Sequence, residues 1–272
     1  MKVSLASHAG FCFGVKRALE SVQNIKDKDD VYILGELIHN PQEIERLKKK
    51  GIKIIGNIDK IKKGTVVISA HGVPDHLIKK AAKKRLKVID TTCPLVTKVH
   101  NIAKDMEKKG LNVVIFGDKN HTEVKGIKGN IKNAVIINNY SDLNKIKKGK
   151  LGIVSQTTQD TEKYSNIINK IKEKTINLKV EDTICDATKL RQNSSRELAK
   201  RVDLMVVIGG YNSANTKRLA QICSGIVETR RIETEDELKK RWFNGKKHIG
   251  VTAGASTPEW VINNVMKKIG GI

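Results

Sequence analysis

Three cysteines recur at the same place in a pattern that repeats along the chain. Cys12, Cys93 and Cys185 are separated by 81 and 92 residues, and 87 residues follow the last of them. Each cysteine follows a short apolar run typical of a strand and precedes a segment with helical patterning. This spacing predicts one βα unit used three times. If the three units pack about a common axis, three thiolates meet at one point, which suits a cofactor better than a disulfide.

Several kinds of chemistry are open to three such thiolates. A helix N-terminus stabilises negative charge and therefore favours thiolates as metal ligands. Zinc is one candidate, but the sequence has no Cys-x-x-Cys pair and structural zinc sites usually close with four ligands. An iron–sulfur cluster with one open iron also fits, although the dense cysteine run of bacterial ferredoxins is absent. Redox sensing and simple burial remain alternatives, and burial is the interpretation for Cys223, which has no counterpart in the other thirds.

Polar residues recur in register with the cysteines. Gly117 lies 24 residues after Cys93, Gly209 lies 24 residues after Cys185, and both glycines end strongly apolar runs. Small polar or histidine-containing segments follow such runs throughout the chain, at residues 39–40, 70–72, 120–123, 156–158, 212–215 and 253–256. Open parallel α/β sheets bind their ligands at the carboxyl ends of strands. The pattern therefore predicts a ligand site built from these segments.

Three of the seven histidines occupy these turns, namely His39, His71 and His121. Their imidazoles can donate hydrogen bonds to a phosphate or a hydroxyl group. Glu123 stands two residues after His121, and a carboxylate facing an anionic ligand would have a raised pKa and could deliver protons. The other histidines are interpreted as surface or packing residues: His8, His76, His100 and His248.

Compact hydroxyl and amide groups accompany the histidines. They include Thr157, Ser213, Asn215 and Ser256. Such groups near helix N-termini can bind phosphate oxygens. Serine and threonine at these places are also ordinary helix caps, so a single motif of this kind carries little weight.

The composition favours an α/β fold with mainly parallel strands. Hydrophobic residues make up 39% of the 272 residues and aromatic residues only 4%, so the core must be mostly Ile, Val, Leu and Ala. Apolar β-branched runs alternate with lysine-rich amphipathic segments. We expect three pseudo-threefold-related α/β units with small sheets, over residues 1–92, 93–184 and 185–272. The first strand, within about residues 1–12, could instead pair with the third unit.

The formal charge of +23 raises nucleic-acid binding as an alternative. The basic residues are spread over many amphipathic segments, however, and no base-stacking aromatic motif accompanies them. No apolar run approaches a membrane span, the N-terminus lacks a signal-peptide pattern, and four scattered cysteines do not form a secreted disulfide framework. We therefore expect a cytoplasmic protein that binds neither nucleic acid nor a membrane.

Taken in order, the motifs resemble those of the 4-hydroxy-3-methylbut-2-enyl diphosphate reductase family, which catalyses the last step of the methylerythritol phosphate route to isoprenoids. The resemblance spans essentially the whole chain, and the run at residues 92–100 is its most specific part. The matching segments are residues 10–15, 39–41, 69–73, 92–100, 121–126, 156–158, 185–188, 212–215 and 251–256.

The resemblance implies a trefoil-like α/β fold around one central 4Fe–4S cluster. It implies that Cys12, Cys93 and Cys185 ligate three irons and that the open fourth iron binds the allylic hydroxyl group of the substrate. Two electrons from a donor such as ferredoxin or flavodoxin, with two protons, would then give isopentenyl and dimethylallyl diphosphate. We expect the protein to be a monomer.

The same resemblance implies roles for the polar residues. Glu123 would supply protons, His121 would face the ligand, and Thr157 would lie beside the substrate hydroxyl. The diphosphate would be held by His39, His71, Ser213, Asn215 and Ser256, together with the backbone N–H of Ala214. Two positions depart from the family pattern: Ala214 replaces a common serine, and Asn120 replaces a common glycine but tolerates a left-handed backbone. A zinc or redox-sensing protein without catalysis stays the competing hypothesis for the cysteines.

Overall fold

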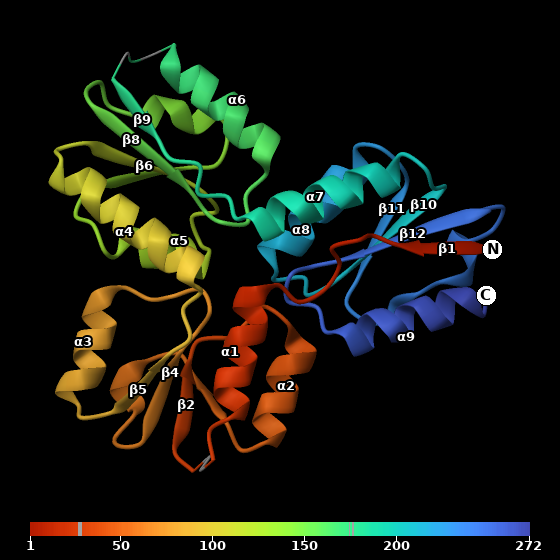
Figure 1. Ribbon diagram of the computed structural model, residues 1–272, viewed down its shortest axis with the longest axis horizontal. Helices are drawn as coiled ribbons and strands as arrows, with labels where there is room; N and C mark the ends of the chain where they lie inside the picture. Colours follow the sequence, from red (N-terminus) through yellow and green to blue (C-terminus); the bar gives the residue numbers. More distant parts are fainter. Residues whose placement is uncertain (27–28, 174, 176) are drawn as a thin grey trace. The chain divides into compact units, whose positions relative to one another are not determined.

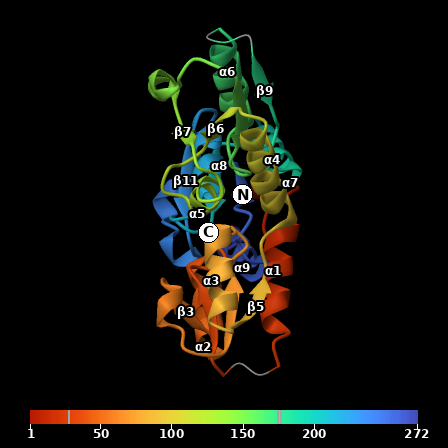
Figure 2. The ribbon, with the colours of Figure 1, turned by 90° about the vertical axis from the view of Figure 1, so that its left-hand side faces the viewer.

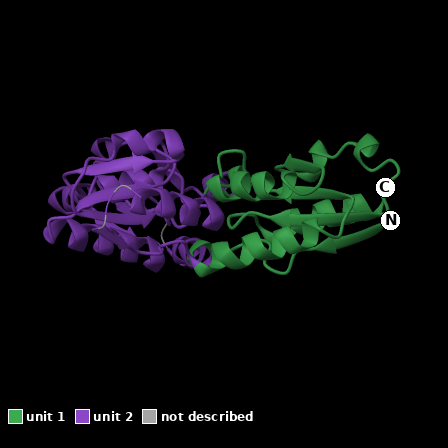
Figure 3. Ribbon diagram, turned by 90° about the horizontal axis from the view of Figure 1, so that it is seen from above, with its two compact units in different colours: residues 1–15, 39–43, 186–272 green, residues 16–38, 44–185 purple. Residues whose placement is uncertain are grey.

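The structure is a computed structural model that describes residues 1–26, 29–173, 175 and 177–272. Its residues form two compact units, which are coloured separately in Figure 3. Unit 1 comprises residues 1–15, 39–43 and 186–272, and unit 2 comprises residues 16–38 and 44–185. The strands form three four-stranded sheets in which every pairing is parallel, as expected from the sequence (Figure 1).

The first and second sheets belong to unit 2. The first sheet has the order β3-β2-β4-β5, with β2 at Val31–Leu34, β3 at Lys53–Ile55, β4 at Thr65–Ile68 and β5 at Lys87–Asp90. Figure 2 shows β3 and β5 at its two edges. The second sheet has the order β7-β6-β8-β9, with β6 at Asn112–Phe116, β7 at Ala134–Ile137, β8 at Leu151–Ser155 and β9 at Leu178–Val180.

The third sheet belongs to unit 1 and combines both ends of the chain. Its order is β1-β12-β10-β11, with β1 at Lys2–Leu5, β10 at Leu204–Ile208, β11 at Thr229–Ile232 and β12 at His248–Ala253. Strand β1 pairs with β12, so that Val3 lies opposite Ile249. The first strand therefore completes the sheet of the last third of the chain. The domain boundaries at residues 92 and 184 stay a prediction.

All three sheets share one plan. The strand at one edge, which is β5, β9 or β1, leads through a short loop to Cys93, Cys185 or Cys12. A helix begins directly after each cysteine: α4 at Pro94–Lys108, α7 at Asp186–Ala199 and α1 at Phe13–Gln23. The strand, cysteine and helix predicted from the spacing are thus present three times.

Five further helices connect consecutive strands, as parallel pairing requires: α2 at Pro41–Lys49, α3 at Asp75–Lys83, α5 at Thr122–Lys128, α6 at Thr161–Lys172 and α8 at Ala214–Ser224. Helix α9, at Glu259–Gly270, follows the last strand. Short 3₁₀ turns occur at Ile58–Lys60, Tyr140–Lys145, Glu235–Glu237 and Lys240–Trp242. Among the described residues, no helix is both long enough and apolar enough to cross a membrane.

Alternating residues of the central strands bury opposite faces of each sheet. In β10, Val206 faces the cluster that contains Val261 and Val265 of α9, whereas Val207 faces the cluster that contains Leu219 of α8. Figure 1 shows α9 on one side of this sheet and α7 and α8 on the other. The second sheet is covered in the same way, by α6 on one face and by α4 and α5 on the other. These two-sided cores explain why the strands are continuous apolar runs.

Candidate functional site

A buried carboxyl group is the centre of the polar residues in unit 2. Glu123, in the first turn of α5, is only 2% exposed. The backbone N–H of Thr157 donates to its Oε1 atom at 2.6 Å, and the Thr157 hydroxyl donates to its Oε2 atom at 2.9 Å. Burial raises the pKa of Glu123 to about 7, although both hydrogen bonds from Thr157 act in the opposite direction. The carboxyl group can therefore carry a proton near neutral pH.

The close approach of α5 to the end of β6 buries this carboxyl group. Gly117 directly follows β6, and a Cβ atom there would lie 2.6 Å from Cγ2 of Val124 and 3.1 Å from Cβ of Gln156. Only glycine permits this approach without displacing backbone or side chains. Gln156 is fully buried, and its Oε1 atom accepts a hydrogen bond from the backbone N–H of Asp118 at 3.0 Å. It ties the loop before α5 to the loop that carries Thr157.

Two of the predicted histidines meet in the same unit. His121 caps α5, and its Nδ1 atom accepts a hydrogen bond from the backbone N–H of Glu123 at 3.2 Å. The rings of His71 and His121 are perpendicular, with centroids 5.6 Å apart. His71 follows β4 in a tight turn, in which the backbone N–H of Gly72 donates to the carbonyl of Ser69 at 3.0 Å. The structure thus gathers His71, His121 and Glu123 beside the carboxyl ends of two different sheets.

Each of the three repeated cysteines is fixed in the same manner by its backbone. The N–H groups of Cys93 and Cys185 donate to the carbonyls of Ala70 and Thr157, at 3.0 and 3.1 Å. In unit 1, the N–H of Cys12 donates to the carbonyl of Ala255 at 3.0 Å. Every acceptor lies in a loop that the sequence marked for ligand binding. The cysteines and the polar loops are therefore joined one to one.

Unit 1 brings together the other predicted polar residues. The Ser256 hydroxyl donates to the carbonyl of His39 at 2.9 Å. Gly210 lies against the same carbonyl, which would be 2.9 Å from a Cβ atom at that position. Asn40 caps the start of α2 by accepting a hydrogen bond from the backbone N–H of Glu43 at 2.9 Å. The loops of His39 and Ser256 are thus held side by side.

The start of α8 presents polar groups suited to an anion. Ser213 is the N-cap residue of this helix, and its hydroxyl oxygen accepts a hydrogen bond from the backbone N–H of Thr216 at 3.3 Å. Ala214 begins the helix, where backbone N–H groups have no acceptor within the helix. Asn215 is only 4% exposed, yet neither amide atom has a hydrogen-bond partner among the described residues. A buried amide left unsatisfied at a helix N-terminus fits a missing polar ligand.

The cysteine thiols differ in their surroundings. All four cysteines belong to the described residues, and none forms a disulfide. Cys12, Cys93 and Cys185 are partly exposed, whereas Cys223 is buried within α8 and burial raises the pKa of its thiol to about 12. Within the described part of either unit, no group of three His, Cys, Asp or Glu side chains is arranged to hold a metal ion. Accessible thiols that start helices suit iron or zinc, and the inert Cys223 does not.

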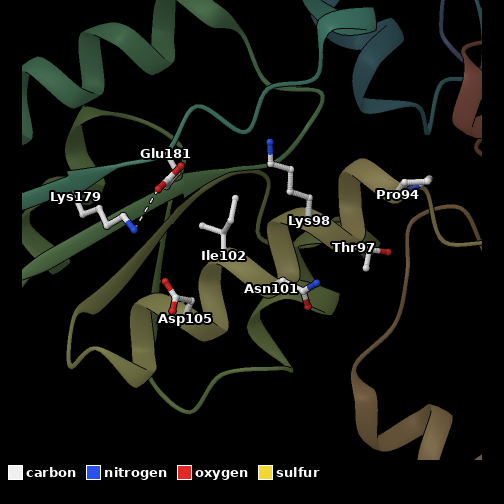
Figure 4. A pocket seen from close by; sticks show the side chains of 8 residues that line it. All are labelled: Pro94, Thr97, Lys98, Asn101, Ile102, Asp105, Lys179 and Glu181. Carbon is white, nitrogen blue, oxygen red and sulfur yellow. Dashed lines mark ion pairs between the residues drawn. The ribbon is translucent and has the colours of Figure 1, made fainter.

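A separate pocket of about 480 Å³ lies between α4 and β9 (Figure 4). Lys179 and Glu181 form an ion pair on one wall, with Nζ and Oε1 3.3 Å apart. The pocket is also lined by Pro94, Thr97, Lys98, Asn101, Ile102 and Asp105. None of the residues predicted for chemistry lines it.

Sequence reasoning missed some of the buried polar residues around the site. Gln156 lies in a predicted motif, but its role in joining two loops depends on contacts between distant residues. His100 was interpreted as a surface or packing residue, and the structure buries it at 6% exposure against the glycine that follows His71. Its place at the end of the motif at residues 92–100 was a signal, but it did not indicate which residues the ring contacts.

The fold and these residues define an α/β protein with three similar sheets, in which each of three strand–cysteine–helix junctions is hydrogen-bonded to a loop that carries polar residues. The chain belongs to the LytB protein family, whose model matches residues 3–270.

Similar proteins cover the chain from end to end. A 4-hydroxy-3-methylbut-2-enyl diphosphate reductase of Clostridioides difficile is 42% identical over 273 residues, which are 98% of each chain. One from Campylobacter jejuni subsp. doylei is 44% identical over 274 residues, which are 99% of this chain and 98% of the other. The solved structure of the E-1-hydroxy-2-methyl-but-2-enyl-4-diphosphate reductase from Plasmodium falciparum has a TM-score of 0.94 at 30% identity. That alignment covers 99% of this chain and 87% of the other.

Proposed function

We propose that this chain is an iron–sulfur reductase that converts (E)-4-hydroxy-3-methylbut-2-enyl diphosphate to isopentenyl diphosphate and dimethylallyl diphosphate. The reaction breaks the allylic C–O bond and forms a C–H bond. It consumes two electrons and two protons, and the hydroxyl group leaves as water. The observation that carries this proposal is the buried Glu123 carboxyl group, which holds a proton near neutral pH and is hydrogen-bonded to the residue that anchors Cys185.

Cys12, Cys93 and Cys185 are proposed to hold one 4Fe–4S cluster whose fourth iron has no protein ligand. The donor set fits such a group, since three accessible thiols stand at helix starts and the only other cysteine is buried. When bound, the cluster supplies electrons and a Lewis acid for the allylic hydroxyl group. The protein must then bind the diphosphate, orient the hydroxyl group and deliver protons.

Five side chains and one backbone group are proposed to bind the diphosphate. They are the side chains of His39, His71, Ser213, Asn215 and Ser256, together with the backbone N–H of Ala214. The unsatisfied amide of Asn215 supports this role, because a phosphate oxygen would give its buried Nδ2 group an acceptor. The diphosphate is not cleaved, so its binding energy serves to position the reacting hydroxyl group.

Proton delivery is assigned to Glu123. A carboxylic acid with a pKa near the working pH combines a useful protonated population with a strong tendency to donate. Thr157 touches both carboxyl oxygens and is placed to relay or orient a hydrogen bond to the departing hydroxyl group. His121 faces the ligand from the cap of α5 and fixes the backbone of Glu123 through its Nδ1 atom.

The two electrons are proposed to come from an external small redox protein such as ferredoxin or flavodoxin. The protein itself is proposed to work as a monomer. The excess of basic residues supports an acidic donor, because opposite charge speeds the encounter of two proteins.

Anaerobic purification with metal analysis and turnover tests this function. The protein should be brown, contain iron and sulfide, and release both isoprenoid diphosphates when it is given a strong one-electron reductant and the hydroxylated substrate. A colourless protein that contains zinc and gains no turnover after cluster reconstitution would refute the proposal and favour the zinc or redox-sensing alternative.

A further inference from the structure

The proposed chemistry leaves one buried imidazole without a role. His100 lies in α4 and is only 6% exposed. The side-chain amide of Asn130 donates to its Nδ1 atom at 3.0 Å, which leaves the ring hydrogen on Nε2. Burial, assisted by the charge of Lys104, lowers the pKa of His100 to about 4. The ring is therefore neutral near pH 7, and its Nε2 atom has no hydrogen-bond partner among the described residues.

Two glycines from different elements pack against the edge of this ring. A Cβ atom at Gly72 would lie 3.1 Å from Cε1 of His100, and one at Gly126 would lie 3.2 Å from its Nε2 atom. Gly72 directly follows His71, whereas Gly126 stands in α5, three residues after Glu123. A Cβ atom at Gly126 would also lie 3.7 Å from the backbone carbonyl carbon of Gly72, so the ring packs at the place where the backbone that carries His71 approaches the helix that carries Glu123.

The ring is held in place by a chain of polar contacts. The same Asn130 side chain accepts a hydrogen bond from the backbone N–H of Asp75 at 2.7 Å, at the start of α3. Lys104, one turn after His100 in α4, forms an ion pair with Asp75 at 2.5 Å. These contacts join α3, α4 and the segment after α5. A hydrocarbon side chain of similar size could fill the same space. It could not, however, accept the hydrogen bond from Asn130 that orients the imidazole ring.

We propose that His100 is a positioning residue that sets the spacing between His71 and Glu123. The proposal rests on the proposed function, in which His71 binds the diphosphate and Glu123 supplies protons. Because the diphosphate is the handle for the reacting hydroxyl group, a change in this spacing moves that group relative to its proton donor. Misplacement by about 1 Å can lower turnover by about a hundredfold.

The substitution His100→Asn separates ring packing from hydrogen bonding. An Asn carbonyl oxygen can take the place of the Nδ1 acceptor for Asn130, while the ring atoms that touch the two glycines are removed. We expect kcat/KM to fall between about tenfold and a hundredfold with iron content and the circular dichroism spectrum unchanged. His76→Asn is the matched control, since His76 lies exposed in α3 and should leave kcat/KM unchanged.

A double-variant cycle tests the contact itself. Gly126→Ala adds a methyl group against Nε2 of His100 and should also lower kcat/KM, whereas Gly270→Ala, in a helix with open space around it, should have no effect. In the double variant His100→Asn/Gly126→Ala the collision is absent. Its kcat/KM should therefore be no lower than that of His100→Asn alone, which is a non-additive result.

The outcomes separate this inference from the function on which it rests. If the unsubstituted holoenzyme fails to reduce the hydroxylated diphosphate, the proposed function fails, whatever the variants do. If the holoenzyme is active and His100→Asn keeps its kcat/KM, or loses only thermal stability, His100 is structural and the inference is wrong. Additive losses in the double variant would also overturn it. If His100→Asn does not fold, the kcat/KM of Gly126→Ala is compared with that of Gly270→Ala. Equal values for these two variants would overturn the inference.

Discussion

The Glu123 carboxyl group combines two properties that oppose each other. It is almost fully buried, which disfavours its charge, and it accepts two hydrogen bonds from Thr157, which favour its charge. The balance leaves its pKa at about 7, above the usual value of 4.5. A proton donor with this pKa can release its proton and recover it at neutral pH. The pKa of Glu123 is thus set by the hydrogen bonds from Thr157 as well as by burial.

The substitution Glu123→Gln should remove the proposed proton donor and preserve the shape of the site. The amide oxygen can still accept from the backbone N–H of Thr157, and the amide NH2 group can donate to the Thr157 hydroxyl oxygen, so folding and iron binding should be preserved. Turnover should fall between about a hundredfold and ten-thousandfold, which is the range for loss of a general acid. Steady-state assays with equal cluster loading measure this change. Near-normal turnover would remove Glu123 from the proton pathway and leave it a structural partner of Thr157.

The same carboxyl group should make the free energy of unfolding depend on pH. Its pKa rises from 4.5 in an unfolded chain to about 7 in the folded state, so the folded protein binds the proton more tightly. This stabilising contribution is complete below pH 4.5 and is lost as the pH rises through 7. It amounts to roughly 3 kcal/mol at most. Denaturant unfolding of the protein and of Glu123→Gln at several pH values measures it, and an equal loss in both would contradict it.

At the scale of the elements, the junction of strand, cysteine and helix is the unit that repeats three times. The backbone N–H of each cysteine bonds to a loop that follows a central strand, and those loops carry His71, Thr157 and Ser256 or their neighbours. A displacement of the helix therefore shifts a thiol and the loop proposed to bind the ligand together. Cys223 has no such junction, because it lies inside α8 and packs against Leu219 and Val207.

The junction cysteines and Cys223 should respond in opposite ways to substitution. Cys93→Ser should lose most of the bound iron and sulfide, because an alcohol at this position is a poor ligand for iron in a cluster. Cys223→Ala should keep the iron and the turnover, and it should lose about 1 kcal/mol of stability through the smaller buried side chain. Iron analysis of both variants after anaerobic reconstitution measures this difference. Iron loss in Cys223→Ala would show that the buried thiol is also needed for the cluster.

The close contact between α5 and the end of β6 should also be sensitive to substitution. Gly117→Ala forces a methyl group to within 2.6 Å of Val124 and 3.1 Å of Gln156, so α5 must shift with Glu123 upon it. We expect a stability loss of about 1–3 kcal/mol and a fall in kcat of about tenfold or more. Gly56→Ala is the matched control, since nothing lies within 4 Å of its Cβ position. Thermal unfolding and steady-state assays measure both effects, and equal behaviour of the two variants would disprove the steric argument.

For the whole molecule, sequence patterns predicted what repeats along the chain and missed what depends on distant contacts. The parallel sheets and the junctions at Cys12, Cys93 and Cys185 follow from apolar runs at regular spacing. The pairing of the first strand with the last third of the chain was one of two alternatives, because an edge strand of four residues carries no pattern that selects its neighbour, and the structure pairs β1 with β12. The hydrogen bonds between Thr157 and Glu123, which are 34 residues apart, and the packing of His100 against Gly126 likewise arise from folding rather than from spacing.

The net charge of +23 belongs to the molecule as a whole, and it should act on the rate of encounter. Many lysines are partly engaged in exposed ion pairs, such as Lys80 with Asp59 and Lys109 with Asp105, so the field arises from dispersed residues. A dispersed positive field attracts a diphosphate over a distance, and salt screens that attraction. We therefore expect kcat/KM for the substrate to fall several-fold between about 0.02 M and 0.3 M salt while kcat stays nearly constant. Stopped-time assays across this range measure both constants.

Duplex DNA added at about 0.15 M salt should not inhibit, because the sequence shows no base-stacking aromatic motif beside the basic residues. Strong inhibition by DNA at that salt concentration would show that the charge forms a true nucleic-acid surface.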